Sequence, residues 1–169
     1  MTSIQAAINV PENQVVYDRS QLDSMFLPTG LMLMLDRVCH VKGPALVCEM
    51  DVLSHWVFPL HFPADPIFPG TLLIEAAGQA VAVWAWHAGF RGRPRLGKVS
   101  ARYFSPVVPQ DRTITLRATV RNRKCVFTGR VEISVFERKV AEVESVIFVI
   151  PPAVLSFPDQ SRDGQASLT

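Results

Sequence analysis

The most apolar stretch of the chain runs from Thr71 to about His87, and at helical spacing it leaves almost no polar face. A helix that is apolar all round is buried rather than lying on the surface. Gly70 and Thr71 stand where this helix would start, since threonine suits an N-cap or a first turn. The pattern therefore predicts one long central helix that the rest of the chain covers.

Two polar side chains interrupt this predicted helix. Glu75 and Gln79 are four residues apart, so that both lie on the same side of a helix. Burying a carboxyl group is costly unless the group is paired or takes part in chemistry. Glu75 is therefore the first candidate for a functional residue.

The chain on both sides of the helix follows the pattern of β-strands. Beyond the Gly- and Arg-rich break at 87–94, apolar and polar residues alternate with period two, which is typical of half-buried strands. A short helix is expected over residues 18–26. The expected strands cover residues 31–41, 45–52, 95–104, 114–120, 131–135 and 141–149.

This order of elements predicts the fold class. Two short strands, a buried helix and four longer strands fit an α+β fold, in which a six-stranded antiparallel sheet curls around the helix. One such sheet covers a helix only partly, so that a dimer is expected. The 169 residues suggest one domain over 31–152, preceded by an arm and short helix over 1–30 and followed by a disordered tail over 153–169.

Composition narrows the classes of function. The net charge of +2 gives no reason to expect a nucleic-acid partner. Every apolar run is too short to span a membrane, and the first ten residues lack the pattern of a signal peptide. Cys39, Cys48 and Cys125 form no CxxC pair, which predicts reduced thiols in a cytoplasmic protein.

A loop with one histidine and three prolines, His61–Gly70, leads into the helix. Loop and helix together give the pattern HFPxDPxxPGxxxxEAxxQ, which resembles the signature of the beta-hydroxyacyl-[acyl carrier protein] dehydratases. Residues 33–38 are similar to the opening strand of the dehydratase/isomerase branch of that family, and residues 98–109 are similar to its third strand. The resemblance covers roughly residues 31–150 and implies the hot-dog fold.

Three features depart from the family pattern. Pro59-Leu60 precedes the histidine where the family usually has a glycine, and Ala64 stands where it often has another. Glu75 matches the plain dehydratase branch, although residues 33–38 match the isomerase branch, whose acid is Asp. The chain sorts into neither branch, and a specialised polyketide or polyene pathway stays open beside fatty-acid synthesis.

The resemblance implies a homodimer or a trimer of dimers, in which His61 of one subunit and Glu75 of the other share an active site. Loss of water from a 3-hydroxyacyl thioester needs a base, an acid and a donor to the enolate oxygen. His61 is the candidate base, Glu75 the acid, Gly70 and Thr71 the thioester-binding positions, and Gln79 a supporting residue. Each also has a plainer interpretation as a structural loop, interface or helix-start residue.

Two further groups of residues are weaker candidates. Aromatic residues more commonly pack in the core, and basic residues more commonly lie on a solvated surface. Aromatic residues that are candidates for the wall of an acyl tunnel are Phe62, Phe68, Trp84, Trp86, Tyr103 and Phe104. Basic residues that are candidates for docking an acidic acyl carrier protein and the phosphate of its pantetheine arm are Arg91, Arg93, Arg95, Lys98 and Arg102.

The expected reaction is dehydration of a 3-hydroxyacyl-[acyl carrier protein] thioester to the 2-enoyl thioester. No metal or redox cofactor is expected, because His55 and His61 lack further residues at metal-ligand spacing. The alternatives are a dehydratase that also isomerises the double bond, and a non-catalytic hot-dog subunit that pairs with an active dehydratase. The order of the histidine and the glutamate favours a dehydratase over a hot-dog thioesterase.

Overall fold

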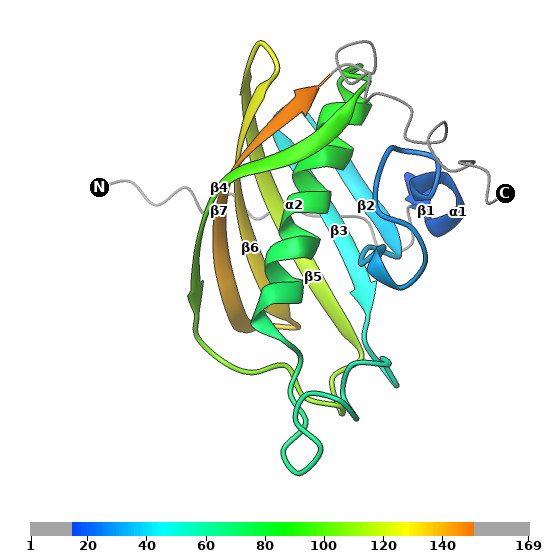
Figure 1. The fold of residues 1–169 in the computed structure, drawn as a ribbon, viewed down its shortest axis with the longest axis vertical. Helices are drawn as coiled ribbons and strands as arrows, with labels where there is room; N and C mark the ends of the chain where they lie inside the picture. Colours follow the sequence, from blue (N-terminus) through cyan, green and yellow to red (C-terminus); the bar gives the residue numbers. More distant parts are fainter. Residues whose placement is uncertain (1–14, 151–169) are drawn as a thin grey trace, which may run out of the picture.

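One long helix, α2 (Gly70–His87), lies against the concave face of a curled antiparallel sheet, as Figure 1 shows for the computed structural model. The structure describes residues 15–150. The tail predicted over 153–169 and most of the predicted N-terminal arm lie outside the described residues. The arrangement of one helix inside a curled antiparallel sheet confirms the predicted fold class.

The sheet has seven strands in the order β1-β2-β3-β5-β6-β7-β4. Two short elements, α1 (Arg19–Leu22) and the 3₁₀ helix η1 (Gly30–Met32), lie between β1 and β2. The strands are β1 (Tyr17–Asp18), β2 (Arg37–Lys42), β3 (Ala45–Asp51), β4 (Arg93–Tyr103), β5 (Thr113–Arg123), β6 (Val126–Val135) and β7 (Arg138–Ile150). The two-residue β1 is the strand that the sequence did not predict.

Alternation along the strands places one apolar face against α2. In β5, Ile114, Leu116, Ala118 and Val120 are buried, and the residues between them are exposed or half-buried. The neighbouring strands keep this register, since Leu116 pairs with Ile133 of β6. The period-two pattern thus becomes one continuous apolar wall around the helix.

The segment predicted as a strand over 31–41 is wrong in its first half. Residues 30–32 form a 3₁₀ turn, and the strand begins only at Arg37. Side chains from elsewhere take the backbone groups that a neighbouring strand would otherwise pair. Gln79 binds the backbone of Met32 and Met34, and Arg19 donates to the carbonyl oxygens of Gly30 and Leu33.

The short helix expected over 18–26 is also shorter than predicted. Asp18 caps it by accepting from the backbone N–H of Gln21, whose side chain in turn accepts from the backbone N–H of Asp18. The helix ends at Leu22, and Phe26 adopts a left-handed backbone with φ of 50°. This conformation cannot continue a helix, so that the chain turns here toward η1.

The strand β4 lies at a free edge of the sheet. It pairs with β7 on one side and with no other strand of residues 15–150. Its inward-facing Leu96, Val99 and Tyr103 are 53%, 37% and 48% exposed, although Tyr103 contacts Gly70 at the start of α2. The sheet is therefore open on this side. Within the described part of the chain, no helix has the length and apolar character needed to cross a membrane.

Candidate active site

A cavity of about 410 Å³ opens beside Glu75. One face of α2 forms its floor, where Gly78 and Ala82 leave a groove because their side chains are small. The other walls come from residues 26–28, residues 93–96 of β4 and Ile147 of β7. The apolar helix had suggested that Glu75 is fully buried. It is only half-buried, because its side of α2 faces this opening.

Gln79 orients the Glu75 carboxyl group by a hydrogen bond. Its side chain is 2% exposed, and its Nε2 donates both to Glu75 Oε1 at 2.9 Å and to the Met32 carbonyl oxygen at 2.7 Å. Its Oε1 accepts from the backbone N–H of Met34 at 2.8 Å. Both amide protons are used, so that the orientation of Gln79 is fixed. Because Glu75 Oε1 is an acceptor here, a proton on this carboxyl group belongs on Oε2.

His61 belongs to the loop between β3 and α2. Figure 1 shows this loop at the end of the molecule where α2 begins. Its Nδ1 is 3.1 Å from the Ile67 carbonyl oxygen, and its ring stacks on Phe62 with the centroids 4.1 Å apart. A carbonyl oxygen only accepts, so that Nδ1 carries the proton in this contact. The neutral ring then has its lone pair on Nε2, which is the arrangement that a base needs.

His61 and Glu75 are not brought together within one chain. No residue of the segment 61–70 lines the cavity beside Glu75, and none lines a smaller cavity near His55. A single chain thus holds the Glu75 carboxyl group at the groove of α2 and the His61 ring in the loop before the helix. The predicted pairing of the two residues requires a second subunit.

The start of α2 is held by Tyr103. Its hydroxyl donates to the Gly70 carbonyl oxygen at 2.8 Å, and partial burial raises the pKa of the hydroxyl, which stays protonated at neutral pH. A Cβ on Gly70 would lie 2.8 Å from the ring of Tyr103, so that only glycine allows this contact. Pro69 provides no side-chain cap. The amides of Gly70 and Thr71 therefore form an uncapped helix start, which favours a negatively charged ligand atom.

The other predicted tunnel residues lie away from the Glu75 cavity. Phe68 is buried between His55 and Phe58, with ring centroids 5.0 and 6.0 Å away. Trp84 donates to the Gly43 carbonyl oxygen at 2.9 Å. Phe62 and Phe104 are largely exposed, and none of the residues predicted for the tunnel lines the cavity.

The residues that do line the cavity come mostly from segments that sequence reasoning did not select. Gly78 and Ala82 are four residues apart along α2, and this spacing of small side chains can be recognised in the sequence. Phe26 carried no local signal, because its place depends on packing against distant Trp86, with ring centroids 5.5 Å apart. The wall that it forms is a product of the tertiary fold.

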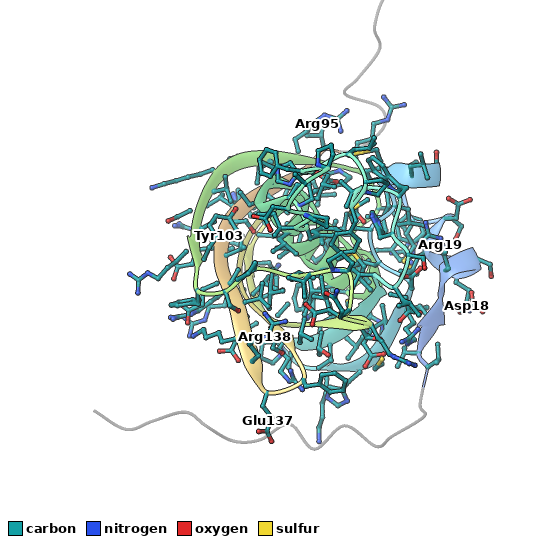
Figure 2. All side chains as sticks on the ribbon, turned by 90° about the horizontal axis from the view of Figure 1, so that it is seen from below. Asp18, Arg19, Arg95, Tyr103, Glu137 and Arg138 are labelled. Carbon is teal, nitrogen blue, oxygen red and sulfur yellow. The ribbon has the colours of Figure 1, made fainter. Side chains whose placement is uncertain are left out.

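The five predicted docking residues separate into three groups. Arg91 is engaged at the end of α2, where it donates to the Trp86 carbonyl oxygen and lies 4.0 Å from the centroid of the Trp86 ring. Arg93 and Arg95 line the cavity beside Glu75, and Figure 2 shows Arg95 at the periphery of the molecule. Lys98 and Arg102 lie farther along β4 and are exposed.

A second, smaller cavity of about 150 Å³ lies near His55. Burial lowers the pKa of this histidine, and the charge of Asp36 only partly opposes the effect. His55 therefore tends to be neutral at pH 7. Among the described residues, no three His, Cys, Asp or Glu side chains gather as a metal site would require.

Comparison with known proteins identifies the family. Residues 27–144 match the model of the FabA-like domain. The chain belongs to the FabA-like family of hot-dog proteins. This confirms the family that the loop and helix signature indicated.

Solved structures with the same fold include dehydratases and thioesterases. The dehydratase heterocomplex ApeI:P from Xenorhabdus doucetiae has a TM-score of 0.65 and 20% identity, over 78% of this chain and 92% of that one. A mutant thioesterase from Staphylococcus aureus has a TM-score of 0.55 and 14% identity, over 68% and 92%. The PaaI protein of the E. coli phenylacetic acid degradation operon has a TM-score of 0.54 and 18% identity, over 66% and 80%. These likenesses show a shared fold.

Proposed function

We propose that this FabA-like chain is a dehydratase that converts a 3-hydroxyacyl-[acyl carrier protein] thioester to the 2-enoyl thioester. The observation that carries the proposal is the Glu75 carboxyl group, which Gln79 fixes at the edge of an apolar groove. A carboxyl group held with one oxygen free and an apolar channel beside it suits an acid that acts on an acyl chain.

The reaction removes a proton from C2 and the hydroxyl group from C3. Nε2 of His61 takes the C2 proton, and the electron pair moves toward the thioester carbonyl. The amides of Gly70 and Thr71 stabilise the enolate oxygen through the uncapped start of α2. The C3–O bond breaks as Oε2 of Glu75 gives its proton to the leaving hydroxyl, which departs as water. Transfer of a proton from the imidazolium to the carboxylate, through solvent, restores the starting state.

The working unit of this mechanism is a pair of hot-dog subunits. His61 of one subunit must reach the groove of the other, because the two residues lie apart in a single chain. The free edge of β4, with its uncovered apolar inner face, supports a subunit contact there. The dehydratase heterocomplex among the structural neighbours supports the pairing of hot-dog subunits. The expectation of a homodimer or a trimer of dimers stays a prediction.

Arg93 and Arg95 are the residues best placed to receive the carrier. They stand at the cavity that contains Glu75, where the phosphate of a pantetheine arm would pass. Arg91 already binds the end of α2 and is less available. The reaction as written needs no metal or redox cofactor.

The test is incubation of the purified protein with 3-hydroxyacyl-[acyl carrier protein] substrates of several chain lengths, followed by mass spectrometry. The expected result is loss of one water by the wild type and a rate lower by about 10²–10⁴ for His61→Ala. A folded His61→Ala variant with full activity contradicts the mechanism. A 3-enoyl product in place of the 2-enoyl one shows that the enzyme also isomerises.

A second candidate function is a non-catalytic partner subunit, which the neighbouring dehydratase heterocomplex favours. It predicts no water loss by the chain alone at any chain length, and activity only after a second hot-dog subunit is added. Release of a free acid, in contrast, would identify a thioesterase.

A further inference from the structure

The outer face of β4 carries positive charges and no negative one. Pairing with β7 sets Arg95 against Phe148, Lys98 against Val146 and Arg102 against Glu142. The strand shifts register between Leu96 and Lys98, and this extra residue keeps all three cations on the same face. The even-numbered partners on β7 point away from the core, since the residues between them are buried.

These charges are only partly compensated within the chain. Glu142 stands beside Arg102, but it already binds Lys139 and lies 3.7 Å from Arg130. Neither Arg95 nor Lys98 forms an ion pair with any residue in 15–150. Within the described residues, the outer face of β4 thus presents two unpaired cations, Arg95 and Lys98.

The same strand has the properties of an edge that another chain covers. It is eleven residues long, its second edge is unpaired in the described residues, and its inner face is apolar and exposed. Long apolar edge strands left open are a liability, and proteins usually cover them. A lysine can by itself protect an edge, but it does not explain why Val99, which does not line the Glu75 cavity, stays 37% exposed on the inner face.

Pairing with a second copy of this chain would bring like charges together. In antiparallel pairing, residues of the outer face stand opposite residues of the outer face, whatever the register. The cations of both copies would then occupy neighbouring strands on one surface of the joined sheet. Like charges in this arrangement are destabilising, whereas opposite charges stabilise the pair.

We propose that β4 pairs preferentially with the edge strand of a different hot-dog subunit, whose outer face carries Asp or Glu opposite Arg95 and Lys98. The inference rests on the proposed function in so far as the active site is shared between two subunits. One site of the pair then combines Glu75 with a base of the acidic partner, and the other combines His61 with an acid of that partner.

A charge-reversed copy of the chain serves as the acidic partner in the test. The dissociation constants of wild type with itself and of wild type with the double variant Arg95→Glu/Lys98→Glu are measured by analytical ultracentrifugation with one labelled species. The mixed pair is expected to bind about tenfold or more tightly than the wild-type pair at about 50 mM salt. The difference should shrink at about 0.5 M salt because the charges are screened.

Two further variants keep the test decisive. Arg121→Glu/Arg123→Glu changes the charge by the same amount on exposed residues of β5 and should give no tighter mixed pair. If the double Glu variant does not fold by circular dichroism, Arg95→Gln/Lys98→Gln replaces it and should associate with itself more tightly than wild type does. A wild-type dimer that is tight, insensitive to salt and not exceeded by the mixed pair overturns the proposal.

An acidic carrier protein is the other occupant that these cations suit. Titration of the same variants with acyl carrier protein separates the two, because weakened carrier binding with unchanged subunit association overturns the proposal in favour of docking. The association measurement does not depend on turnover. Absence of water loss would therefore count against the proposed function and leave the inference about β4 standing.

Discussion

The two sides of α2 differ in how closely they are packed. On the sheet side, Val81 approaches Gly129 of β6 so closely that a Cβ there would lie 2.2 Å from Val81 Cγ2. On the cavity side, a Cβ on Gly78 would come no nearer than 3.9 Å to Ile147 Cδ1. Apart from Glu75 and Gln79 on the cavity side, the residues of α2 on both sides are mostly small or aliphatic. The candidate site therefore lies where small side chains meet no partner, and hydrophobicity alone does not mark it.

The largest effect is expected on the cavity side of α2, from Glu75→Gln. Glutamine keeps an acceptor for Gln79 but has no acidic proton to donate, so that the dehydration rate should fall by about 10²–10⁴. Stability should change by less than about 1 kcal/mol, since the hydrogen bond is retained. Single-turnover kinetics and urea denaturation check the two parts. A variant with wild-type rate would remove Glu75 from the mechanism.

Gly129→Ala probes the packing on the sheet side of α2. The new methyl group would overlap Val81, and overpacking of this kind typically costs about 1–3 kcal/mol of unfolding free energy. Gly78→Ala is the matched control on the cavity side of α2. It has room for its methyl group and removes a helical glycine, so that it should stabilise by about 0.5–1 kcal/mol. Equal effects of the two substitutions in chemical denaturation would contradict the difference between the sides.

Ala82→Leu tests whether the groove holds the acyl chain. The larger side chain would extend into the cavity along α2 and shorten the groove. Turnover of long acyl substrates should fall by about tenfold or more relative to short ones, measured as the ratio of their kcat/KM values. An equal loss for all chain lengths would argue against the groove as the acyl site.

The smallest effect is expected far from both sides of the helix, at Asp51. Hydrogen bonds from Arg37 lower the pKa of this carboxyl group, so that its contribution to stability is present above the unfolded pKa and is lost as the pH falls through the folded one. In Asp51→Asn, stability should depend slightly less on pH below about 4 than in the wild type. Denaturation curves at several acidic pH values measure this. A steeper loss of stability at acidic pH in Asp51→Asn would show that the hydrogen bonds from Arg37 do not stabilise the ionised Asp51 carboxylate.

The elements that repeat a simple pattern could be predicted from the sequence. The apolar run gave α2, and period-two alternation gave the four long strands, because burial on one or all sides determines those patterns. The start of β2 could not be predicted, since side chains of Arg19 and Gln79 reach across to that segment and replace strand pairing. A local window contains no trace of such distant partners.

The candidate site could be predicted in part. The signature pointed to Glu75 and Gln79, which the structure places in direct contact at the cavity. The cavity wall was not predicted, because Phe26 and Leu96 reach it from opposite parts of the chain. Their positions depend on how the N-terminal segment and β4 pack over α2, and neither carries a pattern that distinguishes a cavity wall from ordinary core.

The amide of Gln79 links the Glu75 carboxyl group to a backbone N–H more than forty positions earlier in the chain. Met34 donates to Gln79 Oε1, and Gln79 Nε2 donates to Glu75 Oε1. A chain of two hydrogen bonds polarises when charge appears at its end. The ¹⁵N chemical shift of the Met34 backbone amide should therefore follow the charge of Glu75. The Met34 N–H is then a spectroscopic reporter of proton transfer that needs no label in the active site.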